Sequence, residues 1–478
     1  MGGDFFYFDE TGTVLKGVKN WSIKSAVIPE GVAEIAQKAF YGCESLESID
    51  LPKGLKKIGE DAFCACESLK IVTILESVTK IDMCAFYGCK SLESIDLPEG
   101  LTEIGRGAFY GCESLKGINL PSSLTEIHDH AFCGCKSLTS IAVDEGNTMF
   151  FSKGGVLYRR LKNGKSELVK YPEGKAGESF KVSADTERLG VCAFHGCESL
   201  KSINLPSGLK EISRRAFSGC KSLENIDLPE RLTEIAEYTF SDCKSLKSFD
   251  LPEGLMEIGR SAFHDCESLE SIYLPEGLTE IGDHAFCVCT SMTSITIDEG
   301  NTVYFTKDGV LYRRLENGKN ELVRYPEGKS GESFKVGADT ERLGVCAFHG
   351  CESLKSINLP TGLTAIGWRA FSDCKSLEKI DLPEGLTEIG EDAFRGCESL
   401  ESIDLPEGLK KIGLEAFEGY THLKSIHSAI RDLENVEIDD DAFEGVDKDE
   451  CTLYVPHGKR WAYRHHPVFS KFKHIEME

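Results

Sequence analysis

The chain has 478 residues, and its hydrophobic content of 41% and charged content of 28% are ordinary for a folded protein. Acidic residues outnumber basic residues by 79 to 54, which gives a net charge of −25. This charge disfavours nucleic acid and anionic membranes as partners, and no stretch approaches the roughly 20 apolar residues of a membrane span.

The N-terminal segment, residues 1–24, is predicted to form a cap built on a hairpin. Its first nine residues contain four aromatic side chains but no basic leader, no long apolar stretch and no small-residue cleavage site. We therefore expect no signal peptide in this chain.

From residue 25 onward a phenylalanine returns every 23 residues, in most units as the dipeptide Ala-Phe. A fixed period of this size is typical of stacked repeat architectures, which build extended binding surfaces. The positions are Phe40, Phe63, Phe86, Phe109 and Phe132, then Phe194, Phe217, Phe240, Phe263 and Phe286, then Phe348, Phe371, Phe394 and Phe417.

A typical unit predicts one short strand and one tight turn. The spacing L-x-x-L-x-L over Leu400–Leu405 is the strand-bearing half of a leucine-rich repeat, and Ser402–Leu405 alternates polar and apolar residues. Pro406 and Gly408 fit the second and fourth places of the turn. We expect Gly413–Phe417 to form one short helical turn that places the phenylalanine in the core.

The chain contains 20 cysteines, and most of them follow the same period. Free cysteine is among the most buried residue types, so one cysteine per coil predicts an internal column rather than a disulfide framework. The C-x-C pairs lack a second matching pair with a nearby histidine, so we expect no metal; partial disulfide formation is the alternative. The periodic cysteines are Cys43, Cys66, Cys89, Cys112, Cys135, Cys197, Cys220, Cys243, Cys266, Cys289, Cys351, Cys374 and Cys397.

Two inserts interrupt the period, at about 144–190 and 298–344. Each contains Asn-Gly between two alternating runs, at Asn163-Gly164 and Asn317-Gly318, which is a strong β-hairpin signal. Residues 182–209 and 336–363 agree at 26 of 28 positions, so one long block of the chain is a duplicate of another.

With its unit written S-L-x-S-I-x-L-P-x-G-L-x-x-I-x-x-x-A-F-x-G-C, the chain resembles the BspA-like leucine-rich repeat proteins. The resemblance implies an α/β, β-rich solenoid with parallel strands on a concave side, turns and short helical segments on a convex side, and two hairpin inserts. The expected organisation is a solenoid over 25–446 and a C-terminal cap over 447–478, the cap resembling that of the family at Cys451–Pro456.

The same resemblance implies a bacterial surface or secreted protein that binds host or bacterial proteins, in the manner of an adhesin. Because we expect no export signal and no wall anchor in this chain, a cytoplasmic scaffold with reduced cysteines is the alternative. We expect a monomer that needs no cofactor.

The polar positions of the strands are predicted to line the concave side as an acidic, hydrogen-bonding strip suited to a basic protein partner. Tyr273 interrupts one column, and aromatic residues are enriched at binding hot spots. A solvated strand face without a partner is the alternative. The predicted contact residues are Ser48, Asp50, Ser94, Asp96, Asn119, Asn204, Asp227, Asp250, Tyr273, Asn358, Asp381 and Asp404.

Basic and aromatic residues interleave in the insert hairpins. They either contact a partner, with glycan binding as one form of that contact, or cover the edge of the solenoid while their charges stay in water, and we favour covering of the edge. The residues are Tyr158, Arg159, Arg160, Tyr312, Arg313 and Arg314.

The sequence predicts no enzyme. No H-E-x-x-H motif, phosphate-binding glycine loop or Ser-His-Asp set stands out from the repeats. His195 and His349 are one position copied twice, and we expect both to be solvated surface residues.

Overall fold

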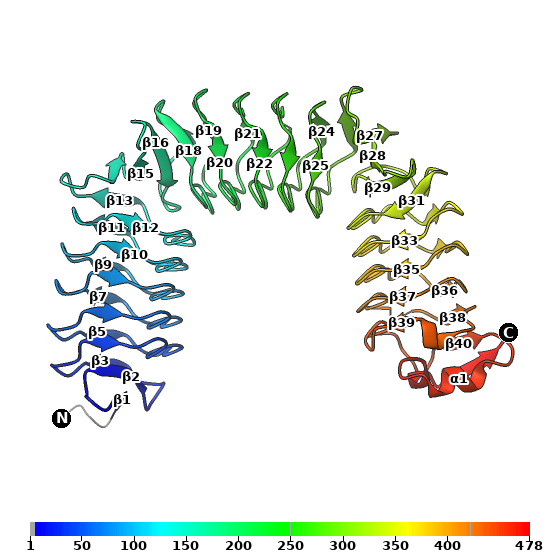
Figure 1. Ribbon diagram of the computed structural model, residues 1–478, viewed down its shortest axis with the longest axis horizontal. Helices are drawn as coiled ribbons and strands as arrows, with labels where there is room; N and C mark the ends of the chain where they lie inside the picture. The colour runs from blue at the N-terminus through cyan, green and yellow to red at the C-terminus, as the bar shows by residue number, and fades with distance from the viewer. Residues whose placement is uncertain (1–4, 249, 421) are drawn as a thin grey trace. The chain divides into compact units, whose positions relative to one another are not determined.

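The computed structural model describes residues 5–248, 250–420 and 422–478. Its contacts divide the chain into two compact units, Met1–Lys244 and Ser245–Glu478, and each is a stack of coils joined by parallel strands (Figure 1). Among the described residues, no helix has the length and apolar character needed to cross a membrane. The predicted leucine-rich repeat solenoid with two hairpin inserts is confirmed.

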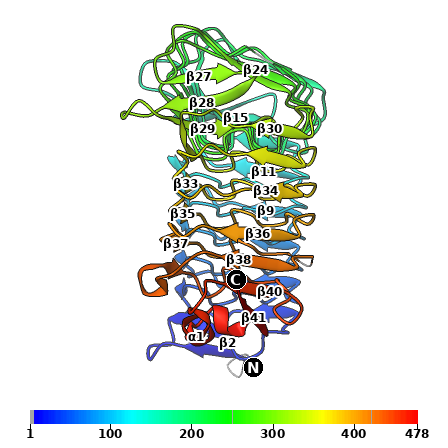
Figure 2. The same ribbon diagram turned by 90° about the vertical axis from the view of Figure 1, so that its right-hand side faces the viewer.

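The L-x-x-L-x-L half of each unit forms the first strand of a coil, here called a leucine strand. Figure 2 shows such strands lying one above another in the second unit. In the first unit they are β3 (Ser25–Val27), β5 (Ser48–Asp50), β7 (Ile71–Thr73), β9 (Ser94–Asp96), β11 (Gly117–Leu120), β13 (Ser140–Val143), β17 (Ser179–Lys181), β19 (Ser202–Asn204) and β21 (Asn225–Ile226). In the second they are β24 (Ser271–Leu274), β26 (Ser294–Ile297), β30 (Ser333–Lys335), β32 (Ser356–Asn358), β34 (Lys379–Ile380), β36 (Ser402–Leu405), β38 (Ser425–Ser428), β40 (Thr452–Val455) and β41 (His474–Met477).

A second, shorter strand follows the turn of each coil, and these strands also pair in parallel. In the first unit they are β4 (Glu34–Ile35), β6 (Lys57–Ile58), β8 (Lys80–Ile81), β10 (Glu103–Ile104), β12 (Glu126–Ile127), β18 (Thr186–Leu189), β20 (Glu211–Ile212) and β22 (Glu234–Ile235). In the second unit they are β23 (Glu257–Ile258), β25 (Glu280–Ile281), β31 (Thr340–Leu343), β33 (Ala365–Ile366), β35 (Glu388–Ile389), β37 (Lys411–Ile412) and β39 (Glu437–Ile438).

The ends and the inserts depart from this pattern. At the N-terminus β1 (Phe6–Phe8) and β2 (Val14–Val18) form an antiparallel hairpin, and β2 pairs with β4. The inserts add the antiparallel strands β14 (Phe150–Lys153), β15 (Val156–Arg160) and β16 (Ser166–Lys170), and in the copy β27 (Tyr304–Lys307), β28 (Val310–Arg314) and β29 (Asn320–Arg324). The C-terminal segment contains η1 (Leu433–Asn435), α1 (Arg460–His465) and η2 (Phe469–Lys471).

The periodic phenylalanines form a stacked column inside each unit. Phe40 and Phe63 have ring centroids 5.1 Å apart, and Phe394 and Phe417 lie 5.4 Å apart with nearly parallel planes. In the inserts Tyr171 stacks on Phe194 at 5.4 Å and Tyr325 stacks on Phe348 at 5.3 Å. Each insert therefore contains a further coil, in which tyrosine takes the place of phenylalanine.

The segment before each phenylalanine is a series of turns, and the predicted short helical turn is wrong. Glu415, two residues before Phe417, has a φ of 52°, and the equivalent His130 has a φ of 62°. A left-handed residue interrupts a right-handed helix. The amide of the phenylalanine, two residues later, then bonds to the neighbouring coil, as in the 2.9 Å bond from Phe417 N–H to the carbonyl of Ala442.

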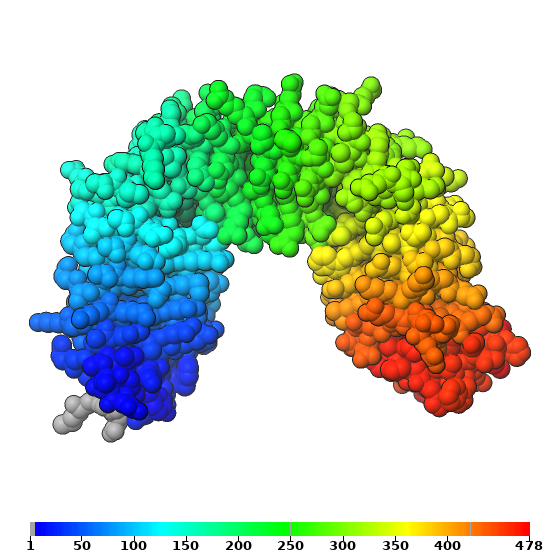
Figure 3. All heavy atoms as spheres, in the orientation of Figure 1, coloured from blue at the N-terminus to red at the C-terminus, as the bar shows by residue number. Residues whose placement is uncertain are grey.

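The periodic cysteines are buried, as predicted, and all cysteines are free thiols in the structure. Their sulfur also bonds to the backbone: the thiol of Cys66 donates to the carbonyl of Phe40 at 3.1 Å, and that of Cys374 to the carbonyl of Phe348 at 3.0 Å. Burial raises the pKa of Cys220 to about 12. Side chains of successive coils cover the outside of each unit (Figure 3).

Truncating one member of the phenylalanine column tests how strongly it holds the coils together. Phe217 is fully buried, so Phe217→Ala is expected to lower the free energy of unfolding by about 3–5 kcal/mol. The exposed substitution Glu230→Ala should change it by less than about 0.5 kcal/mol. Denaturant unfolding, with hydrogen exchange to locate the loosened coils, measures both. Equal effects of the two substitutions would contradict the conclusion that the phenylalanine column holds the coils together.

Candidate binding surface

The leucine strands expose every second side chain on one surface of each unit, here called the strand face. In β5 the serine and the aspartate are exposed, and Ile49 between them is 6% exposed. The same alternation recurs in β9, β19 and β32. It follows from the two-residue period of a strand, which sends the isoleucine into the core and its neighbours into solvent.

Parallel pairing in register arranges these exposed residues in columns across the sheet. Ile71 pairs with Ser94, and Thr73 pairs with Asp96. In the second unit Tyr273 pairs with Thr296. Because adjacent strands lie about 4.8 Å apart, one partner segment can contact several coils at once.

The residues that precede the leucine strands carry both signs of charge and pair with each other. Lys70 lies 3.3 Å from Glu47, and Lys116 lies 2.6 Å from Glu93. In the described part of the chain, no ion pair involves Asp50. Surface pairs of this kind contribute only about 0–1 kcal/mol to stability. Their positive and negative charges nevertheless cancel within the column of residues that precede the leucine strands. The negative charge of the strand face therefore comes mainly from the aspartates.

Large exposed side chains also lie on the strand face. Val27 is 65% exposed and Ile71 is 59% exposed, and Val27 pairs with Asp50 across β3 and β5. Tyr273 is 51% exposed, and its hydroxyl donates a 2.8 Å hydrogen bond to Asp298. This bond raises the pKa of Tyr273. Apolar and aromatic groups beside carboxylates are the combination expected at a protein-binding surface.

All of the predicted strand-face residues are exposed, but some lie just beyond a strand. Asp227 follows β21 and Asp381 follows β34, while Asp250 lies outside any described strand. Asp381 is also 3.2 Å from the amine of Lys379. The residues within the strands are Ser48, Asp50, Ser94, Asp96, Asn119, Asn204, Tyr273, Asn358 and Asp404.

The structure corrects the idea that the insert tyrosines contact a partner. Tyr158 is 1% exposed and Tyr312 is 3% exposed, so neither ring is available to a partner. They stack on Phe151 and Phe305 respectively. The insert aromatics therefore cover the edge of the solenoid, as the favoured interpretation predicts.

The insert arginines make internal contacts instead of facing solvent freely. Arg159 lies 3.2 Å from Glu167 and donates to the carbonyl of Ile127 at 3.0 Å. Arg160 donates to the carbonyl of Asn147 at 3.1 Å. In the copy Arg313 pairs with Glu321 at 2.6 Å, and Arg314 donates to the carbonyl of Asn301 at 3.2 Å.

A buried ion pair in each insert replaces a missing turn. In the coil of Tyr171, strand β16 occupies the place where other coils form their turns. Lys170 lies 2.9 Å from Glu173, both side chains being at least 96% buried. Glu173 accepts from Gly134 N–H at 2.7 Å, and Lys170 donates to the carbonyl of His195 at 3.2 Å. These two side chains thus bond backbone groups that a turn would otherwise bond.

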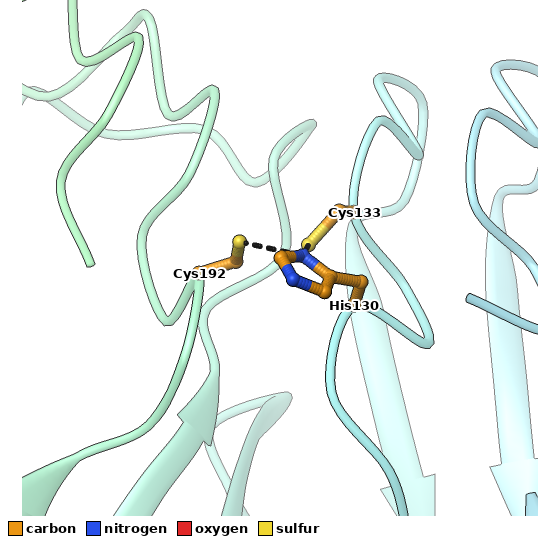
Figure 4. Close-up of side chains that lie close together, drawn as sticks. All are labelled: His130, Cys133 and Cys192. Carbon is orange, nitrogen blue, oxygen red and sulfur yellow. Dashed lines mark hydrogen bonds between the residues drawn. The ribbon is translucent and has the colours of Figure 1, made fainter. Parts of the chain in front are cut away.

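The fold also brings together residues that the sequence analysis did not connect. His130 and Cys133 lie against Cys192 beside the insert of the first unit (Figure 4). A hydrogen bond from Cys133 lowers the pKa of Cys192, and the positive charge of Lys170 lowers it further. Burial acts in the opposite direction but is the smaller effect. The only sequence signal was the shared position of His130 and Cys192, each two residues before a periodic phenylalanine.

His195 is partly buried beside this region, so the prediction of a solvated surface residue is wrong. Burial lowers the pKa of His195 to about 4, with a further contribution from the charge of Lys170. The charged and titratable groups near it also include Glu173, Arg215 and His130. Burial likewise lowers the pKa of His349 in the copy.

This shift predicts a pH-dependent stability of the first unit. Between pH 6.5 and about 4 the unfolded chain binds a proton at His195 that the folded chain does not bind, so stability falls as the pH falls. The contribution reaches about 3 kcal/mol at most. Urea unfolding of the wild type and of His195→Gln at pH 7 and pH 4.5 measures it. Between pH 7 and pH 4.5 the variant should lose less unfolding free energy than the wild type. Equal losses in the two proteins would contradict the prediction.

Comparison with known proteins identifies the family. The model for the BspA type leucine rich repeat region matches residues 18–149, 173–293 and 327–448, in six copies. These ranges cover more than half of the chain, so the chain belongs to the BspA-type leucine-rich repeat family. No curated protein matches the chain.

The first two of the following solved structures share the fold. A leucine rich cell surface protein from Faecalibacterium prausnitzii is 22% identical with a TM-score of 0.51, covering 100% of this chain and 94% of that one. The pneumococcal vaccine antigen PcpA is 21% identical with a TM-score of 0.50, covering 69% and 98%. A leucine-rich repeat protein from Bacteroides ovatus is 28% identical with a TM-score of 0.41, covering 91% and 97%.

Proposed function

We propose that this BspA-type leucine-rich repeat protein is a non-enzymatic binding module that holds a basic protein partner on its strand face. The observation that carries the proposal is the set of exposed aspartates on this face, together with exposed Val27, Ile71 and Tyr273. The neighbouring column neutralises itself through Lys–Glu pairs, so the aspartates give the face a net negative potential.

The architecture supports binding of an extended partner. Each coil contributes two or three exposed side chains, so an individual contact is small and affinity accumulates over several coils. Carboxylates beside apolar and aromatic groups complement a segment that carries lysine or arginine next to apolar residues. We therefore propose a protein partner with a basic surface, either a host extracellular protein or a bacterial surface protein.

We propose further that the protein acts at the cell surface or after secretion. The similar structure from Faecalibacterium prausnitzii is described as a cell surface protein, and that from pneumococcus as a vaccine antigen. Glycan binding through the insert tyrosines is not proposed, because Tyr158 and Tyr312 are buried and cannot stack on a sugar.

Charge-neutral substitutions on the strand face test the binding proposal. Asp50→Asn/Asp96→Asn should weaken capture of a basic partner by about two- to thirtyfold, since an exposed charge pair contributes about 0.2–1 kcal/mol. Glu10→Gln/Asp449→Asn removes the same charge elsewhere on exposed positions and should leave affinity unchanged. The measurement is the dissociation constant, at two salt concentrations, for a partner isolated from host extracellular or bacterial surface proteins. Equal affinities of the two variants would reject the strand face as the site.

Protease treatment of intact cells tests the location. A surface protein is degraded while a cytoplasmic marker stays intact, and a secreted protein is recovered from the medium. If the protein survives treatment of intact cells and is degraded only after lysis, the surface proposal fails and the cytoplasmic scaffold with reduced cysteines replaces it.

A further inference from the structure

Each unit contains one cluster of a histidine and two cysteines at the same place beside its insert. In the first, Nδ1 of His130 lies 3.1 Å from Sγ of Cys192 and 3.8 Å from Sγ of Cys133. In the second, Nδ1 of His284 lies 3.0 Å from Sγ of Cys346 and 3.7 Å from Sγ of Cys287. Within each cluster all three atoms lie within 4.8 Å of one another.

The insert creates this arrangement. His130 and Cys133 belong to the last turn before the hairpin, and Cys192 belongs to the first turn after it, 62 residues from His130. Because the coil between them has no turn, the two turns face each other across the gap. In Figure 4 the thiols of Cys133 and Cys192 both point toward the ring of His130.

The three atoms are ligands of the type that zinc selects. Thiolate sulfur and imidazole nitrogen bind Zn²⁺, whereas Mg²⁺ and Ca²⁺ require oxygen ligands. Two thiolates and one neutral imidazole balance the charge of Zn²⁺, which suits a buried position. Two of the nearby cations are already paired with carboxylates, Lys170 with Glu173 and Arg159 with Glu167.

Space for a fourth ligand lies beside each cluster. A cavity of about 50 Å³ is lined by His130 and Cys133, and one of about 90 Å³ by His284 and Cys287. A water needs roughly 10–15 Å³ of such space. The site is therefore suited to tetrahedral coordination by three protein ligands and one water.

We propose that each unit binds one Zn²⁺ through its histidine and two cysteines, which joins the turns on either side of the insert. The ions would act as structural links, so they would hold each hairpin insert in register with its solenoid. This proposal does not depend on the identity of any protein partner.

A third pair of cysteines provides an internal control. Cys64 and Cys84 occupy the same repeat positions as Cys133 and Cys192, with Asp61 in place of the histidine. No insert separates their coils, and in the described ranges these three residues form no cluster of ligand atoms within 4.8 Å. Cys84→Ser therefore removes one thiol from an equivalent position without touching either proposed site.

Metal analysis of the full-length protein tests the proposal. Reduced, chelator-treated protein is dialysed against a defined Zn²⁺ concentration, and two Zn²⁺ per chain are expected. Cys192→Ser and Cys346→Ser should each lose one ion, the double variant should lose both, and Cys84→Ser should keep two. His130→Ala is a second variant of the first site and should also lose one ion.

Cobalt substitution and melting separate a built site from loose adsorption or misfolding. Co²⁺ should give a thiolate charge-transfer band and tetrahedral d–d bands, both halved in each single variant. Without metal, the variants should have the same melting temperature as the wild type. Zn²⁺ should raise the melting temperature of the wild type and of Cys84→Ser, but not that of the double variant.

Three results would overturn the proposal. The first is fewer than one Zn²⁺ per wild-type chain. The second is undiminished zinc in the folded ligand variants. The third is a disulfide between Cys133 and Cys192 whose reduction yields protein that binds no Zn²⁺.

Discussion

The coils depend on one another because the backbone of each coil finds its hydrogen-bond partners in its neighbours. Phe40 N–H donates to the carbonyl of Ala62 at 2.8 Å, Phe63 N–H to Ala85 at 2.8 Å, and the pattern continues along each unit. A buried amide without a partner is costly. Every coil must therefore place its backbone N–H and C=O groups in register with those of the previous coil. Coils of equal length keep this register, which explains the strict period of 23 residues. The stacked rings, the cysteine column and the exposed columns of the strand face all follow from this registration.

The inserts show how the constraint is met where the period breaks. Strand β16 removes one turn, and Lys170 with Glu173 supplies hydrogen bonds in its place to Gly134 and His195. Burying an ion pair is costly unless both charges and their remaining hydrogen bonds are satisfied. The gap left by that turn also brings His130, Cys133 and Cys192 together, so one local departure from the repeat produces both the buried ion pair and the His–Cys–Cys cluster.

Much of the fold could be predicted because its signals are local. The spacing of Leu400–Leu405 specified the leucine strand, and Asn163-Gly164 specified the hairpin turn. The spacing of the phenylalanines does not predict the coil inside each insert, because tyrosine takes the place of phenylalanine at Tyr171, 23 residues before Phe194. The short helical turn was wrong because a residue such as Glu415 adopts a left-handed conformation that its sequence does not reveal. This conformation lets Phe417, two residues later, donate its N–H to the carbonyl of Ala442 in the next coil.

The sequence by itself determined the repeat, the family resemblance, the strand face and the position of the hairpins, since each depends on residues close together in the chain. Only the tertiary structure decided that Tyr158 and Tyr312 are buried, that His195 lies beside a buried ion pair, and that His130 faces Cys192. These outcomes depend on which coils lie against each other across an insert. A separation of 62 residues in the sequence does not predict the contact between His130 and Cys192.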